Sequence, residues 1–171
     1  VGIDILASPK VFVHHLKVSN CWGDGIYVGA IGGVGTTAIS SDVTLSHVLS
    51  TNNRRQGLSM GPLTRIYVVS STFSETNGTA PQDGIDIEPQ TQGTTRNVRI
   101  EGCTLTGNTG SGLELAQHVT GVTVVSTTIS AGAADGIAIS RVEIPMPPWL
   151  PPPTRLARST FHRISSSAAP R

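Results

Sequence analysis

The sequence predicts an all-β fold, a single-stranded parallel β-helix (solenoid) of about five coils that occupies residues 1–140. The first indication is a motif of glycine, an apolar residue, a variable residue and a second apolar residue. It occurs six times, with its glycines at positions 2, 25, 57, 84, 112 and 136. A repeat of this length is typical of solenoids, in which each unit buries its apolar edge only against its neighbours. The second indication is composition: only 13% of residues are charged and 4% aromatic, while the abundant Val, Ile, Thr, Ser and Gly suit short strands joined by turns.

A second apolar alternation follows each of the first five motifs. These runs cover residues 11–18, 43–48, 66–73, 98–105 and 122–129. Within each run, alternation directs the apolar side chains to one side of a strand. In the middle of each run the step between apolar positions changes from two residues to three, which predicts a bend. Each repeat would therefore hold three short strands and three turns, and stacked repeats would form three parallel sheets around an apolar core.

The turns between strands are rich in Asn, Gly, Asp and Ser, which tolerate left-handed backbone and bond their own main chain. We expect the motif glycine to meet a conformational need at a tight corner. Two connections, residues 29–42 and 74–83, are longer than the others. Insertions in solenoids often gather on one face, so these connections are expected to border a binding surface. Cys103 falls in an apolar column and is expected to face the core as a small hydrophobe.

Charge and composition divide the chain after residue 140. Residues 1–140 hold seven Lys/Arg and ten Asp/Glu, a net −3, whereas residues 141–171 hold five Arg and one Glu, a net +4. The acidic body argues against a nucleic-acid partner. The last 31 residues contain no glycine but seven of the 11 prolines, which predicts an extended or disordered tail.

Neither a membrane span nor a signal peptide is visible in the sequence. There is no apolar run of 18 residues and no basic segment followed by an apolar one at the N-terminus. Because the chain opens inside a repeat, we expect a piece of a longer solenoid. The full-length protein would then have further coils and could form a homotrimer.

The fullest copy of the motif runs from Gln82 to Pro89, with the sequence QDGIDIEP, and is preceded one repeat earlier by NRRQG at 53–57. These stacked motifs resemble the right-handed β-helix repeats of the pectin lyase-like superfamily, over residues 1–140. The resemblance implies a right-handed helix and an extracellular bacterial or phage protein that acts on acidic polysaccharides. The superfamily includes lyases, hydrolases, C5-epimerases and tailspike-type depolymerases. The chain lacks the Asp-Asp and Gly-His-Gly pattern of polygalacturonases, the Asp-Pro-His-Glu signature of mannuronan epimerases and the calcium-and-arginine pattern of pectate lyases, so the reaction class stays open.

Four acidic residues are the candidate catalytic groups. In the motif strand the two apolar residues point inward, and the residues before, between and after them point outward. Repeat stacking would therefore gather acids on one exposed sheet face, and the predicted catalytic set is Asp83, Asp86, Glu88 and Glu114. Asp86 and Glu114 would be stacked neighbours, while Asp86 and Glu88 would lie roughly 6.5 to 7 Å apart. Such crowding should raise the pKa of one group and split a pair into an acid and a base, as glycoside hydrolysis requires.

The candidate substrate-binding residues are Asp24, Tyr27, Arg54 and Arg55. Tyr27 would stack on a sugar ring. Arg54 and Arg55 would either hold a uronate carboxylate or form ion pairs with Asp83 and Glu88. Asp24 lies in the same outward column as Asp83. No metal site or cofactor is predicted from ligand spacing, although Ca²⁺ bound by the acids remains an alternative.

Two functions are compatible with these residues. The first is an extracellular β-helix protein that cleaves or modifies an acidic, uronate-containing polysaccharide, with Asp86 and Glu88 as acid and base or one of them as nucleophile. The second is a non-catalytic β-helix module for glycan binding, adhesion or virion attachment. In that case the acids would be calcium ligands or plain surface.

Overall fold

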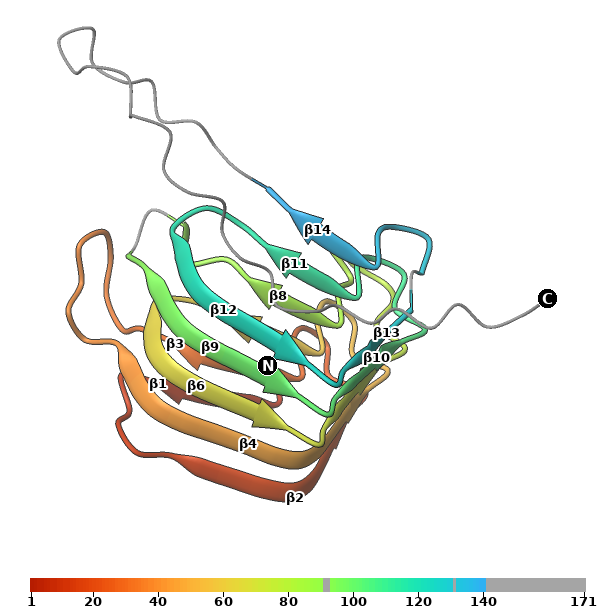
Figure 1. The fold of residues 1–171 in the computed structure, drawn as a ribbon, viewed down its shortest axis with the longest axis horizontal. Coiled ribbons are helices and arrows are strands. Elements are labelled where there is room, and N and C mark those ends of the chain that lie inside the picture. The colour runs from red at the N-terminus through yellow and green to blue at the C-terminus, as the bar shows by residue number, and fades with distance from the viewer. Residues whose placement is uncertain (91–92, 131, 141–171) are drawn as a thin grey trace, which may run out of the picture.

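The computed structural model describes residues 1–90, 93–130 and 132–140, and these residues form an all-β structure with parallel strands (Figure 1). One strand from each motif enters a six-stranded sheet. Its order is β1 (Ile3–Leu6), β3 (Ile26–Gly29), β5 (Leu58–Met60), β8 (Ile85–Ile87), β11 (Leu113–Leu115) and β14 (Ile137–Ile139). Strands that are distant along the chain are thus direct neighbours, which fits a parallel β-solenoid. The predicted tail, residues 141–171, lies outside the described residues.

The second apolar runs form one curved eight-stranded sheet. Its strands are β2 (Phe12–Ser19), β4 (Ser40–Thr51), β6 (Leu63–Val69), β7 (Thr72–Ser74), β9 (Thr95–Glu101), β10 (Thr104–Thr106), β12 (Val119–Val125) and β13 (Thr128–Ile129). The expectation of three separate sheets is therefore wrong. Strand β4 passes through the bend without interruption and pairs with β6 on one side of it and with β7 on the other. Figure 1 shows the long strands curving around the stack.

The predicted bend in each run is confirmed, and it has a backbone cause. One residue with left-handed φ stands at the three-residue step of every run: His15, His47, Ser70, Gly102 and Ser126, with φ between 48° and 62°. Left-handed backbone turns the strand sharply. In β2 and β4 the turn leaves the strand continuous, whereas in the later coils the strand is broken there. Two hydrogen-bonded sheets rather than three are the result.

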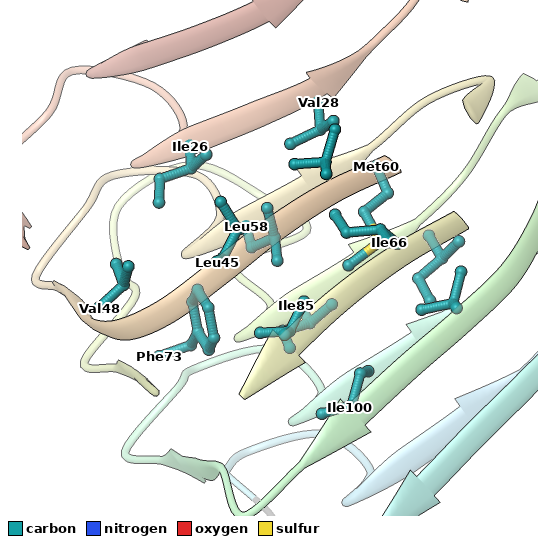
Figure 2. Close-up of a cluster of buried hydrophobic side chains, with 14 of the residues drawn as sticks. Ile26, Val28, Leu45, Val48, Leu58, Met60, Ile66, Phe73, Ile85 and Ile100 are labelled. Carbon is teal, nitrogen blue, oxygen red and sulfur yellow. The ribbon is translucent and has the colours of Figure 1, made fainter. Parts of the chain in front are cut away.

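The core consists of apolar residues stacked in register from coil to coil, as predicted. Val43 pairs with Ile66, which pairs in turn with Val98. Beside this column Leu45 pairs with Val68. Figure 2 shows side chains from both sheets meeting in the interior, among them Ile26, Leu58 and Ile85 from the motif strands. Cys103 is buried among them, as expected.

The motif glycines serve close packing between coils, and not a special backbone conformation. None of them has a left-handed φ. Instead, a Cβ built on Gly57 would lie 2.6 Å from the carbonyl oxygen of Gly84, and one on Gly84 would lie 2.7 Å from the carbonyl oxygen of Gly112. Those same oxygens accept the backbone N–H groups of Leu58 and Ile85 at 3.0 Å. The conformational explanation is therefore wrong: glycine is required because the next coil's backbone occupies the space of a side chain.

Candidate functional site

Five residues that directly precede a motif glycine were expected to form a column that faces solvent: Asp24, Gln56, Asp83, Ser111 and Asp135. Asp135, before the last motif strand, is exposed as expected. The other four are buried, so for them the expectation is wrong. The strand alternation does direct these side chains away from the apolar core. However, each one lies at the junction of a turn and a strand, where the turns and side chains of adjacent coils cover it. The backbone N–H of Ser111, for example, donates to Asp83 Oδ1 at 2.6 Å from the next coil.

Three of the four predicted catalytic acids meet at one point on the six-stranded sheet. Asp86 on β8 is paired directly with Glu114 on β11, which confirms that they are stacked neighbours. Carboxylate oxygens of Asp83, Asp86 and Glu114 all lie within 4.8 Å of one another. Asp83 and Asp86 are only 1% and 3% exposed, while Glu114 is half-buried. We call these three residues the acid cluster.

Burial dominates the electrostatics of the acid cluster. The pKa of Asp86 is raised to about 7: removal from water is the main cause, the nearby charge of Glu88 adds to it, and a hydrogen bond from Gln56 opposes it. The pKa of Asp83 is raised to about 6, again mainly by burial; the Ser111 amide opposes this shift, and Glu114 adds to it. The sequence predicted raised pKa values from like charge, but desolvation is the larger cause.

Within residues 1–90, 93–130 and 132–140, no positively charged side chain forms a salt bridge with the acid cluster. The three salt bridges among the described residues join Arg55 to Asp24, Arg65 to Asp42 and Arg99 to Glu101. The cluster therefore lowers its negative charge by keeping carboxyl groups protonated, in agreement with the raised pKa values of Asp83 and Asp86. The 4.8 Å span of its oxygens would also allow one cation to contact all three side chains.

Glu88, the fourth predicted catalytic acid, lies beside the cluster on the solvent side. It follows β8 directly, is exposed, and its backbone N–H donates to the Met60 carbonyl at 2.9 Å. Its carboxylate is 3.5 Å from the side-chain amide of Gln90. The negative charge of Glu88 raises the pKa of Asp86, so the two carboxyl groups interact electrostatically across the end of β8.

Gln56 is the site residue that sequence reasoning did not select. It is completely buried, and its Nε2 donates to Asp86 Oδ2. A signal was available, because Gln56 occupies the same position before the motif glycine as Asp24 and Asp83. Because its side chain is uncharged, Gln56 was not a candidate acid or base.

The predicted substrate-binding residues form a second group, about two strand spacings or roughly 10 Å from the acid cluster along the stack. Arg55 Nη1 contacts both carboxylate oxygens of Asp24, at 3.1 and 3.2 Å. Pairing of Arg55 with Asp83 or Glu88, one of the two expectations, is therefore wrong. The backbone N–H of Arg55 donates to the Gly23 carbonyl at 3.1 Å, which holds this turn against the one that carries Asp24. Burial raises the pKa of Asp24 despite this partner.

Arg54 turns away from the acids. Its guanidinium lies 4.3 Å from the ring centroid of Trp22, and its Nε donates to Thr79 Oγ1 at 2.9 Å. Pairing of Arg54 with Asp83 or Glu88 is also wrong, because the contact with Trp22 holds the side chain at the turn. Trp22 itself is exposed.

Tyr27 lies half-buried on the outer face of β3, paired with Asp4 on β1 and Ser59 on β5. Its ring covers Gly29 and Gly61, at both of which a Cβ would collide with the phenol. Burial, with smaller effects of Asp4 and Asp24, raises the pKa of its hydroxyl. The small residues therefore serve to seat the Tyr27 ring flat against the sheet.

The site thus consists of a proton-holding acid cluster, an adjacent exposed carboxyl group, and an Asp24–Arg55 pair beside a flat aromatic ring. No family model, curated protein or solved structure matches the chain. Chemically, the arrangement can hold a proton near neutral pH, can offer a second carboxyl group to a reactant, and can present a guanidinium to an anionic group.

Among the described residues no helix is long and apolar enough to cross a membrane.

Proposed function

We propose that this chain is a right-handed parallel β-helix of about five coils, similar to the pectin lyase-like superfamily, which processes an acidic polysaccharide outside the cell. The observation that carries the proposal is the acid cluster: Asp83, Asp86 and Glu114 come together from two coils and form no salt bridge with any side chain in the part of the chain that the structure describes. Burying carboxyl groups in this way costs stability. A sheet that served only as a scaffold would be more stable with Ser or Thr at these positions.

In this proposal the cluster supplies a proton and Glu88 supplies the second carboxyl group. Asp86 holds its proton near neutral pH, and Glu114 is the member of the cluster that reaches the solvent side. Proton delivery to a glycosidic oxygen at this edge, with Glu88 acting on water or on the sugar, would cleave the chain by hydrolysis. Alternatively, an ionised carboxylate of the site would remove the C5 proton. Breaking of the C4–O bond, with a proton passed from the cluster to the leaving oxygen, would then complete an elimination, whereas return of a proton to the opposite face of C5 would complete an epimerisation.

The second group of residues gives the proposal its substrate class. The Asp24–Arg55 pair and the Tyr27 ring lie on the same sheet as the cluster, along the stacking direction. A polysaccharide lying across the strands would pass over both groups. Arg55 has a side chain that is 39% exposed, so its guanidinium can still bind a uronate carboxylate from the open side.

One observation favours the alternative, a non-catalytic module for glycan binding, adhesion or virion attachment. Asp86 is 3% exposed, so a substrate reaches it only through Glu114, Glu88 or movement of the surrounding turns. A module of this kind would bind a glycan without changing it.

The test compares the wild-type chain with Asp86→Asn and with the double variant Asp86→Asn/Glu88→Gln on a panel of uronate and neutral polysaccharides. Reducing ends report hydrolysis and ultraviolet absorbance reports unsaturated products. We expect turnover on a uronate polymer, and a loss of about 10²-fold or more in both variants with binding retained, because general acid–base groups contribute that much.

The matched control is Asp4→Asn, an exposed acid at the equivalent position of β1, and it should leave turnover unchanged. Binding without turnover of any polymer would support the module. Absence of both binding and turnover would refute the polysaccharide proposal.

A further inference from the structure

Three side-chain amides are buried among the described residues: Asn53, Gln56 and Asn108. Two of them are hydrogen bonded at both ends to groups that do not titrate. Asn53 Nδ2 donates to Ser50 Oγ at 2.9 Å, and its Oδ1 accepts from the Cys21 backbone N–H at 3.1 Å. Their bonds join one coil to the next, so these two amides hold the turn in place.

Asn108 repeats this arrangement. Its Nδ2 donates to the Phe73 carbonyl at 3.2 Å, and its Oδ1 accepts from the backbone N–H and the hydroxyl of Thr76 at 3.2 and 2.7 Å. Both polar atoms of this amide are therefore satisfied by fixed neighbours, and neither has reason to reorient.

Gln56 differs from both. Its Nε2 donates to Asp86 Oδ2, and its Oε1 has no hydrogen-bond partner among the residues that the structure describes, although this side chain is fully buried. A buried carbonyl oxygen without a donor costs about 1–3 kcal/mol. This amide therefore stabilises the turn less than Asn53 and Asn108 do. The group that it contacts, Asp86, is a member of the acid cluster.

The chemistry of Asp86 explains why such an amide is useful. An ionised carboxylate accepts hydrogen bonds only, and the Gln56 NH₂ group provides one. A protonated carboxyl group also has an O–H to donate, and the Gln56 oxygen would accept it after the amide turns by half a rotation. The two orientations fill nearly the same volume, since amide O and NH₂ differ little in size.

We propose that Gln56 is a positioning residue for Asp86. Its amide rotates by half a turn when Asp86 gains or loses its proton, so that both forms of the carboxyl group stay hydrogen bonded. Any contribution of this rotation to catalysis rests on the proposed function, but the rotation itself is independent of that function. The other groups that act on Asp86 are acids: Glu88, Asp83 and Glu114. Arg55 acts on Asp83 from the preceding turn.

The direct test is NMR of the wild-type chain with ¹⁵N-labelled amides and ¹³C-labelled Asp carboxyls, titrated from pH 4 to pH 9 without substrate. We expect the Gln56 NH₂ signals to shift with the same midpoint as the Asp86 carboxyl. The Asn53 and Asn108 NH₂ signals serve as internal controls and should not follow that midpoint. Gln56 signals that stay constant while Asp86 titrates would overturn the proposal.

A variant provides the second readout. Gln56→Met keeps the length of the side chain but removes both donor and acceptor. Because Asp86 then loses its donor, its midpoint should rise by about one pH unit or more. An unchanged midpoint in a folded variant would contradict the positioning role. If the variant fails to fold, the wild-type titration still decides the question.

Failure of this inference and failure of the proposed function can be told apart. The titrations need no polysaccharide, so they can succeed even if no polymer is turned over. If turnover is found, Gln56→Met should shift the pH profile of kcat toward higher pH with little change in KM. A purely structural role would lower activity without moving the profile.

Discussion

Asp86 combines burial with crowding by like charges. It is nearly inaccessible to water, Glu88 lies just beyond the end of its own strand, and Glu114 is paired with it on the next strand. Both burial and the neighbouring acids disfavour the charged form, and the single donor that Gln56 supplies does not compensate. Asp86 therefore shifts its pKa to near neutral and keeps a proton that an exposed aspartate would lose.

This shift makes folding stability depend on pH. In the unfolded chain Asp86 titrates near its ordinary pKa of 3.8, and in the folded chain near 7. Between these values the folded state binds more protons than the unfolded state, so the free energy of unfolding falls as pH rises from about 4 to 7. Asp86→Asn cannot ionise and should remove most of this decline, which amounts to at most about 4 kcal/mol.

Urea unfolding of the two proteins at pH 4.5, 6 and 7.5 measures the effect. Asp83 contributes a similar decline up to about pH 6, so the profile of Asp86→Asn should flatten without becoming level. Asp4→Asn, at the exposed end of the sheet, should keep the wild-type profile. Parallel profiles for wild type and Asp86→Asn would mean that Asp86 carries no such shift.

Most residues of the candidate site could be predicted from the sequence, but their hydrogen-bond and salt-bridge partners could not. Asp86 and Glu114 were predictable because both occupy the variable position of the motif, and in-register stacking pairs like positions. The Asp24–Arg55 pair was not, because the turn geometry that decides which coil Arg55 reaches is absent from the repeat pattern. The expected exposure of Asp83, Asp86 and Gln56 was also wrong, because all three are buried. Alternation shows which side chains point away from the core, but not whether neighbouring turns and side chains cover them.

Among the elements, the motif strands depend on a close approach between coils. Each of β1, β3, β5, β8 and β11 begins directly after a glycine whose missing Cβ leaves room for the carbonyl oxygen of the next coil. That oxygen accepts the first N–H of the strand. Glycine therefore fixes both the spacing of the coils and the start of the ladder, which in turn sets Asp83 and Asp86 at their distances from Glu114.

Gly57→Ala should destabilise the chain by about 1–3 kcal/mol, because the new methyl group meets the backbone oxygen of Gly84, which cannot move without breaking the ladder. Thermal or urea unfolding measures the loss. Gly33→Ala is the matched control, since a Cβ there has no neighbour within 4 Å and no left-handed φ opposes it. Equal stability of the two variants would show that close packing is not why the motif requires glycine.

The bends of the curved sheet were predictable in position but not in consequence. The three-residue step correctly marked the places where His47, Ser70 and Gly102 adopt left-handed φ. Strand β4 is continuous and pairs with the continuous strand β2 on both sides of the bend. On its other side it faces two separate strands, β6 before the bend and β7 after it.

On the scale of the whole molecule, stacking converts distance along the chain into proximity on one face. Asp83 and Asp86 belong to one repeat and Glu114 to the next, and the parallel, in-register pairing of β8 with β11 brings them together. The repeat pattern in the sequence was sufficient to predict this pairing, because a solenoid has few other ways to bury its apolar columns. The handedness of the coil depends on features that the repeat pattern does not encode.

The central claim is that stacking and burial create an acid cluster that holds a proton near neutral pH. Its most direct measurement is the ¹³C titration of the Asp86 carboxyl group in the wild-type chain and in Glu114→Gln. A midpoint near 7 in the wild type, lowered when the neighbouring charge of Glu114 is removed, is the result we predict. A midpoint near 4 in both proteins would contradict it, because Asp86 would then be an ordinary solvated aspartate with no link to the adjacent coil.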